Sequence, residues 1–112
     1  MDEERILTEV GTNEWQVVVF LLGDQPYAIN VDKTREILRW TGVRPVPQSH
    51  PAMLGITTVR GEVIPLVDLR TYLGIKSNVP LEQSKVIVAE FNQMKLGFVV
   101  DGVERIYRIN SE

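Results

Sequence analysis

The sequence predicts a mostly β protein built from two similar lobes, and two observations lead to this fold class. Apolar residues recur in short runs separated by turn residues, as in a series of hairpins. The run from Trp15 to Leu22 has apolar side chains on both faces, so this strand should be covered on both sides, in a small barrel or between two sheets. The second observation is an internal repeat at an offset of 69 residues.

The repeat aligns two parts of the chain without a gap. The aligned pairs are 17–19 with 86–88, 29–32 with 98–101, and 31–37 with 100–106. Such repeats predict related lobes that share a core. The second copy has no counterpart of residues 44–74. Because unpaired strand edges attract other chains, we expect either a chain cut from a longer protein or a second copy that covers the gap.

The first elements follow from local signals. A helix is predicted over residues 2–9, because acidic residues favour the positive end of a helix. Strands at 15–22 and 27–31 form a hairpin across a Gly-Asp-Gln-Pro turn. Asp32 is expected to cap a short helix over 33–39, since its carboxylate can accept backbone N–H groups of the first turn.

The middle of the chain combines short elements with one clear hairpin. A strand is predicted over 43–46, and one helical turn over 51–54, with a proline at its first position. Residues 55–68 indicate two apolar strands folded across an Arg-Gly-Glu turn, where Gly61 tolerates a positive φ. Pro65 cannot donate to a ladder, so its strand is expected to be an edge or bulged at that point.

The last part of the chain repeats the hairpin pattern. Asp68 is expected to cap a final helical turn over 69–73, which a glycine closes. Strands at 85–91 and 95–100 form a second hairpin, and a strand at 105–109 follows. The predicted division is an N-terminal helix and loop at 1–13, a first β-barrel lobe at 14–74, a linker at 75–84 and a partial second β-barrel lobe at 85–112.

Composition narrows the possible functions. The chain has 112 residues and a formal net charge of −3, whereas nucleic-acid binders usually present a basic face. It has no cysteine, which excludes disulfides and a thiolate zinc site. The acidic start lacks a hydrophobic run, and no apolar run approaches the ~20 residues of a membrane helix, so a cytoplasmic location is expected.

No group of residues indicates bond-making chemistry, so we predict that the chain is not an enzyme. His50 is the only histidine, and a capping or solvent-exposed role is favoured over a general base or a metal ligand. Glu62 and Asp68 are six residues apart, but an acidic residue after a strand usually caps the next helical turn. The glycines lack phosphate-loop spacing. No cofactor or metal is expected.

Arg60 lies at the tip of the predicted hairpin and is a candidate recognition group. Its charge is permanent, and its planar fork suits carboxylates on a partner. The alternative is an ion pair within its own domain, with Glu62 or Asp68. Both roles are compatible with each other.

An ordered series of motifs over residues 15–109 resembles the CheW-like domain of bacterial chemotaxis. The motifs are Phe20-Leu21-Leu22-Gly23-Asp24, Tyr27-Ala28-Ile29, Arg35-Glu36-Ile37, Val46-Pro47, Val59-Arg60-Gly61, Val63-Ile64-Pro65, Val67-Asp68-Leu69-Arg70 and Val99-Val100-Asp101-Gly102-Val103. The leading helix and Gly11-Thr12-Asn13-Glu14 also resemble CheV, in which a CheW-like domain precedes a receiver domain.

The resemblance implies two SH3-like β-barrels on a shared core, the second of them incomplete here. It implies a scaffold that couples the tips of chemoreceptors to the regulatory domain of the histidine kinase CheA, with self-association through the incomplete second lobe as a further expectation. The implied partner-binding positions are Thr34, Glu36, Arg60, Gly61, Gly97 and Val103. The alternatives are a detached CheW-like regulatory lobe of a kinase and a small β-barrel that binds nucleic acid.

Overall fold

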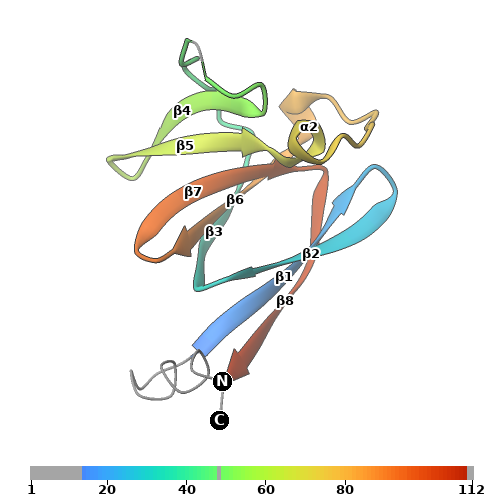
Figure 1. The fold of residues 1–112 in the computed structure, drawn as a ribbon, viewed down its shortest axis with the longest axis vertical. Coiled ribbons are helices and arrows are strands. Elements are labelled where there is room, and N and C mark those ends of the chain that lie inside the picture. The colour runs from blue at the N-terminus through green and yellow to red at the C-terminus, as the bar shows by residue number, and fades with distance from the viewer. Residues whose placement is uncertain (1–13, 48, 111–112) are drawn as a thin grey trace.

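The computed structural model describes residues 14–47 and 49–110, which form two β-sheets and two short helices (Figure 1). The elements in chain order are β1 (Glu14–Leu22), β2 (Gln25–Val31), β3 (Lys33–Arg39), β4 (Met53–Val59), β5 (Glu62–Asp68), α2 (Leu69–Leu73), the 3-10 helix η1 (Leu81–Gln83), β6 (Lys85–Phe91), β7 (Met94–Val100) and β8 (Gly102–Asn110). Within this described part, no helix is long and apolar enough to cross a membrane.

The two sheets interleave the two halves of the chain. A three-stranded sheet has the order β2-β1-β8, and a five-stranded sheet has the order β3-β6-β7-β5-β4 (Figure 1). Neighbouring strands are antiparallel, except that β5 runs parallel to β7. The predicted lobes at 14–74 and 85–112 are therefore not separate. Strands β3, β4 and β5 of the first segment lie in one sheet with β6 and β7, and β8 lies in one sheet with β1 and β2.

The structure confirms the internal repeat. Strands β1, β2 and β3 correspond, at the offset of 69, to β6, β7 and β8, and the hairpins β1–β2 and β6–β7 share one register. The third strand of each copy pairs with the first strand of the other, with a bulge at equivalent places. The backbone N–H of Asn92 donates to the Asp32 carboxylate, and that of Gly23 to the Asp101 carboxylate, both over 2.7 Å. The two halves are thus related by an approximate two-fold axis.

Two clusters of buried side chains stabilise this arrangement. The shared core lies between the sheets, and its fully buried members include Val18 of β1 and Ile87 of β6, which are equivalent in the repeat. The second cluster lies on the other face of the five-stranded sheet and includes Leu66, Val86 and Val99. Removal of this apolar surface from water is the main driving force for folding.

The five-stranded sheet curls so that its two edges approach each other. Trp40, just after β3, and Leu54 of β4 pack against the same buried cluster, although β3 and β4 are the opposite edges of the sheet. The mostly β fold class predicted from the sequence is therefore correct, and the strands lie in two sheets.

Three local predictions were wrong. Residues 33–39 form β3 and not a helix, because alternate side chains are exposed and half-buried and the strand pairs with β6. Residues 43–46 contribute only an isolated bridge, from Arg44 to Ile56. Residues 51–54 form a turn that leads into β4 at Met53. The predicted helix over 2–9 lies outside the described residues.

Other local predictions were confirmed. Asp68 caps α2, and its carboxylate accepts the backbone N–H of Arg70 over 3.0 Å. Gly74 closes this helix in the left-handed conformation, with φ 69°. Strand β5 lies between β7 and β4, but its pairing with β7 begins one residue after Pro65. At Pro65 the strand therefore pairs only with β4, as expected of an edge.

Candidate functional site

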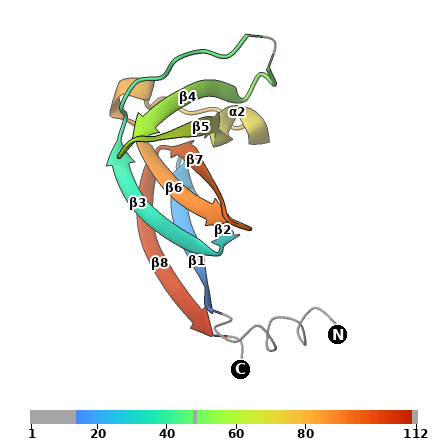
Figure 2. The ribbon, with the colours of Figure 1, turned by 90° about the vertical axis from the view of Figure 1, so that its left-hand side faces the viewer.

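A groove between β3 and β8 contains two of the residues predicted as partner-binding. Its volume is about 430 Å³. The lining residues are Gln16, Thr34, Arg35, Glu36, Ile37, Ile106 and Arg108. Figure 2 shows β3 and β8 on the same side of the molecule. The groove therefore lies where the two halves of the fold exchange their strands.

The apolar part of this groove comes from one residue of each half. Ile37 is 39% exposed and Ile106 is 37% exposed. These residues are equivalent in the repeat, so the approximate two-fold axis relates them. Arg108 is exposed and adds positive charge beside this apolar pair; Arg35 is also exposed, and its guanidinium lies 3.4 Å from the Glu90 carboxylate. The groove thus presents apolar contacts flanked by cations, and a partner helix with apolar and acidic side chains fits this chemistry.

Arg60 makes a two-point ion pair with Glu36 across the curled sheet. The guanidinium Nε lies 2.7 Å from Glu36 Oε2, and Nη2 lies 3.3 Å from Oε1. The Arg60 side chain is 79% exposed, whereas that of Glu36 is 22% exposed. The pair joins the tip of the β4–β5 hairpin to β3. The sequence predicted either a recognition role or a pair with Glu62 or Asp68; the pair exists, but its acid is Glu36.

This ion pair changes the acidity of both groups. The hydrogen bond from Arg60 lowers the pKa of Glu36 below its ordinary value. The same hydrogen bond raises the pKa of the Arg60 guanidinium. Both groups are therefore charged at neutral pH, and the hairpin tip stays joined to β3.

We expect replacement of Arg60 by Ala to raise the pKa of Glu36. Because the pKa of Glu36 is lower in the folded protein, the ion pair stabilises the fold fully at pH values above the unfolded carboxyl pKa of about 4.3. This stabilisation is lost as the pH falls through the pKa that Glu36 has in the folded protein. A carboxyl NMR titration measures the pKa directly. Arg35→Ala is the control, because Arg35 acts on Glu36 only through a weaker Coulombic attraction. An unchanged Glu36 pKa in Arg60→Ala would exclude the pair.

Thr34 lies at the inner wall of the groove. Its backbone N–H donates to the Gln16 side-chain oxygen over 2.8 Å, which joins β3 to β1 of the other sheet. Its hydroxyl is buried and has no hydrogen-bond partner among the described residues. The position thus holds the two sheets together through its backbone.

The other predicted partner-binding residues lie elsewhere. Gly61 follows Arg60 in the exposed hairpin turn, with φ 82°. Val103, the repeat equivalent of Thr34, packs against the shared core. Gly97 is buried in β7, and a Cβ built there would lie 2.4 Å from Leu66 Cδ2. The structure therefore brings Thr34, Glu36 and Arg60 together, and places Gly97 in the interior.

Sequence reasoning missed the apolar pair and Arg108 as candidates. A signal was present, because the repeat aligned Ile37 directly with Ile106. Because residues 33–39 were interpreted as a helix, this alignment did not indicate a shared groove. The two isoleucines reach one groove only when β3 pairs with β6 and β8 pairs with β1. Arg108 had no comparable signal in the sequence.

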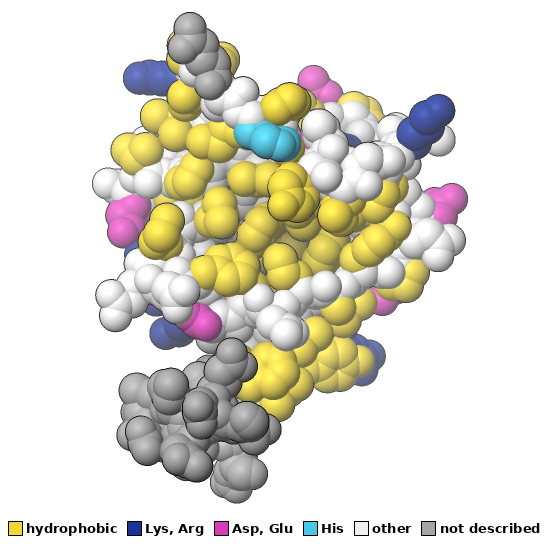
Figure 3. Space-filling model, viewed as in Figure 1, with side chains coloured by type: hydrophobic (Ala, Val, Ile, Leu, Met, Phe, Trp, Pro, Cys, Tyr) yellow, Lys and Arg dark blue, Asp and Glu magenta, His cyan; other side chains and the backbone are white. Residues whose placement is uncertain are grey.

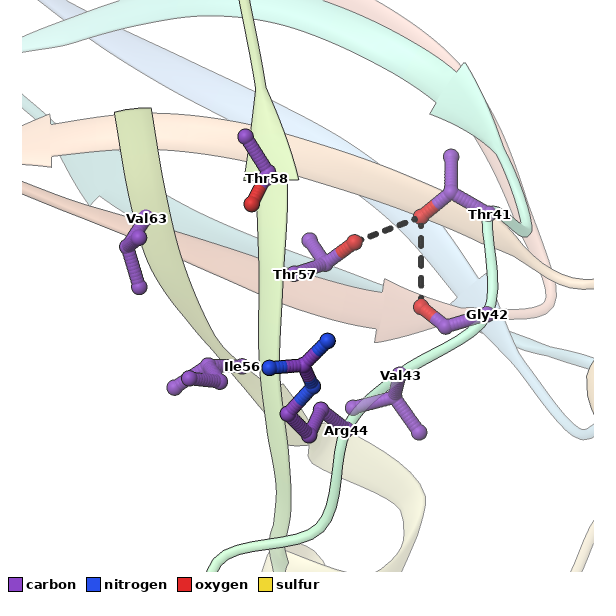
Figure 4. Close-up of a pocket in the computed structure, with 8 residues that line it drawn as sticks. All are labelled: Thr41, Gly42, Val43, Arg44, Ile56, Thr57, Thr58 and Val63. Carbon is purple, nitrogen blue, oxygen red and sulfur yellow. Dashed lines mark hydrogen bonds between the residues drawn. The ribbon is translucent and has the colours of Figure 1, made fainter. Parts of the chain in front are cut away.

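A second hollow, of about 330 Å³, lies at the outer edge of β4. Figure 4 shows that segment 41–44 lines it on one side and strands β4 and β5 on the other. The Thr41 hydroxyl lies 3.3 Å from that of Thr57, and Val63 is 64% exposed at the rim. The hollow is a small surface depression with no group suited to catalysis.

The candidate acid–base residues have structural roles. His50 is exposed, and its Nδ1 accepts the backbone N–H of Ala52 over 2.9 Å, which confirms the predicted capping role. Asp68 binds Arg70, whereas Glu62 binds Lys95, so the two carboxylates do not act as a pair. The described residues therefore offer no arrangement of nucleophile and base.

The geometry defines a class: a duplicated β fold whose halves exchange strands and form a groove at the exchange. Residues 16–112 match the family described as the CheW-like domain. The chain belongs to the CheW-like domain family.

Named relatives agree with this assignment. A probable chemotaxis protein CheW from Rhizobium etli is 35% identical over 97 residues, which cover 87% of this chain and 63% of the relative. Chemotaxis protein CheV3 from Helicobacter pylori is 38% identical over 85 residues, or 75% of this chain and 27% of that protein. The crystal structure of scaffolding protein TtCheW from Thermoanaerobacter tengcongensis matches with a TM-score of 0.72 and 27% identity, covering 85% of this chain and 65% of that one. The chain thus spans less than two thirds of these relatives.

Proposed function

We propose that this protein is a non-catalytic adaptor that couples chemoreceptors to the histidine kinase CheA in bacterial chemotaxis. The observation that carries the proposal is the groove between β3 and β8, in a chain of the CheW-like family. Relatives named as chemotaxis and scaffolding proteins support the same role.

The groove suits a helix from the tip of a receptor coiled coil. Ile37 and Ile106 receive apolar side chains of the helix, and Arg35 and Arg108 lie beside them to attract acidic ones. Arg60 contributes through its ion pair with Glu36 of the groove lining, which orients the guanidinium and leaves most of the side chain exposed. An oriented arginine loses less conformational freedom when a partner carboxylate binds.

The regulatory domain of CheA is the second proposed partner, as the family resemblance implies. Self-association through the second lobe stays a prediction, which light scattering of the pure protein tests. A cytoplasmic location also stays a prediction. Reading the gene beyond Glu112 distinguishes the adaptor from a detached kinase lobe, and salt-sensitive oligonucleotide binding would favour the nucleic-acid alternative.

We expect Arg60→Ala to weaken the binding of a receptor-tip fragment by about three- to tenfold, because one charge-assisted contact is lost. The fold should remain intact, since the side chain is largely exposed. Isothermal titration with a soluble receptor-tip fragment measures the affinity. Arg39→Ala, an exposed arginine outside the groove lining, is the matched control. Equal affinity of the Arg60→Ala and parent proteins would remove Arg60 from the site.

We expect Ile106→Asp to weaken the same binding by about tenfold or more, because a charge replaces an apolar contact near the groove centre. The residue is partly exposed, so the protein should still fold. The control is Met94→Asp, which changes a more exposed apolar residue outside the groove lining. If both variants lose the same affinity, or neither does, the groove is not the receptor site.

A further inference from the structure

The carboxamide of Gln16 is held in one orientation at the groove between β3 and β8. Gln16 lies on β1 and lines the groove, and its Oε1 accepts the backbone N–H of Thr34 over 2.8 Å. Because a backbone N–H can only donate, the carboxamide oxygen must face it, and the amide nitrogen must face another way. That nitrogen has two N–H donors, and no described residue accepts a hydrogen bond from it. Gln16 therefore offers the groove an oriented donor.

Arg108 is the cross-strand neighbour of Gln16. The two residues are opposed in the antiparallel register of β1 and β8, two positions along from the pair of Val18 and Ile106. Side chains two apart on a strand share a face, and the Cβ atoms of directly opposed residues are about 5 Å apart. Gln16 and Arg108 both line the groove. The amide of one and the guanidinium of the other can therefore bind a single group there.

Arg108 differs from the other charged residues that line the groove, because those residues already have partners. Arg35 lies 3.4 Å from the Glu90 carboxylate. Glu36 lies 2.7 Å from the Arg60 guanidinium. Arg108 is exposed, and it makes no ion pair with any residue that the structure describes. The groove therefore has one uncompensated positive charge beside one oriented amide.

The repeat shows that the fold does not require this pair of side chains. The equivalents of Gln16 and Arg108 are Lys85 and Arg39, which are opposed in the same way on β6 and β3. Lysine has no hydrogen-bond acceptor, so Lys85 cannot bind a backbone N–H as Gln16 does. Neither of these equivalents lines the groove. Arg39 is therefore a matched control for Arg108.

The face seen in Figure 1 offers no comparable charge near its centre. Hydrophobic side chains gather across the middle of this face, and Lys, Arg, Asp and Glu side chains lie around its margin (Figure 3). An acidic side chain of a partner would lose its water there without gaining a cation, which is unfavourable. The groove on the β3 and β8 side of the molecule, which faces the viewer in Figure 2, suits a carboxylate better.

We propose that Gln16 and Arg108 form a carboxylate-binding subsite, which receives an Asp or Glu side chain of the receptor-tip helix bound in the groove. Arg108 donates to the carboxylate from its guanidinium, and Gln16 donates from its amide nitrogen. The Thr34 N–H fixes the orientation of this amide before the partner binds. The inference rests on the proposed function and adds the contact that sets the partner helix in register.

Isothermal titration with a soluble receptor-tip fragment tests the cation of the subsite. Each Asp and Glu of the fragment is changed in turn to its amide, and we expect one of these changes to weaken binding to the parent protein by about tenfold. Arg108→Gln should weaken binding of the parent fragment by the same factor, with no further loss when the two changes are combined. Arg39→Gln is the control and should leave the affinity unchanged.

Gln16→Glu tests the amide separately, because the introduced carboxylate still accepts the Thr34 N–H but has no donor and repels an acid. This variant should bind the parent fragment about tenfold more weakly. It should regain much of this loss with the amide-substituted fragment, and a purely structural role of Gln16 would not reverse the preference. In the parent protein, the side-chain amide resonances of Gln16 should shift at saturation, whereas those of Gln83, exposed outside the groove lining, should not.

The same titrations separate failure of the subsite from failure of the adaptor role. The subsite is overturned if no acidic position of the fragment couples to Arg108, or if Gln16→Glu keeps the preference of the parent protein. When Ile106→Asp still weakens binding in that case, the groove remains the receptor site and only this inference fails. A fragment that does not bind the parent protein at all would overturn both.

Discussion

Replacement of Arg70 by Met should lower the free energy of unfolding by about 3–5 kcal/mol, because it leaves two buried carboxylates without their cation. Arg70 donates to Asp68 Oδ1 and to Asp101 Oδ1, both over 3.1 Å, and to the carbonyl oxygen of Val79 over 2.7 Å. The side chains of Arg70, Asp68 and Asp101 are 10%, 11% and 5% exposed. The residue thus ties α2 to the end of β7.

Urea denaturation followed by tryptophan fluorescence measures this loss. The matched control is Arg35→Met, because Arg35 makes an exposed ion pair with Glu90 at 3.4 Å. An exposed pair contributes at most about 1 kcal/mol. A loss below 1 kcal/mol in Arg70→Met, or equal losses in the two variants, would show that the buried network does not stabilise the fold as described.

Gly55→Ala should lower the free energy of unfolding by about 2–4 kcal/mol, through a steric clash and backbone strain. A Cβ at this position would lie 2.1 Å from the carbonyl oxygen of Arg44, and φ at Gly55 is 146°. The clashing atom belongs to the backbone, so it cannot move aside as a flexible side chain can. The bridge between Arg44 and Ile56 is expected to break.

The control for this variant is Gly102→Ala in β8. A Cβ there would lie 3.6 Å from Leu21 Cδ1, which is ordinary contact. Its stability should change by less than about 1 kcal/mol. Thermal unfolding of both variants, together with the amide shift of Ile56, tests the argument. A Gly55→Ala protein as stable as the Gly102→Ala protein would contradict the close approach of segment 41–44 to β4.

Much of the fold was predictable because it depends on local sequence patterns that occur twice in the chain. The two hairpin patterns at the offset of 69 predicted β1, β2, β6 and β7, and Asp68 predicted the cap of α2. The exchange of β3 and β8 was not predictable, since it depends on pairing between distant segments. The aspartate before β3 favoured a helix cap, and tertiary pairing overrode that local preference.

The candidate site was predictable only in part. Family motifs indicated Thr34, Glu36 and Arg60, which the structure brings together. The sequence alone did not identify Glu36 as the acidic partner of Arg60, because the two residues approach each other only when the five-stranded sheet curls. Gly97 also came from the resemblance; its buried position leaves room for Leu66, and a role in partner binding stays a prediction.

The most direct test of the adaptor role is titration of a receptor-tip peptide into the protein, followed by backbone amide chemical shifts. We expect saturable shifts that cluster at Thr34, Glu36, Ile37 and Ile106, and that are lost in Ile106→Asp while Met94→Asp retains them. Shifts that are absent, or that spread evenly over both sheets, would contradict the account.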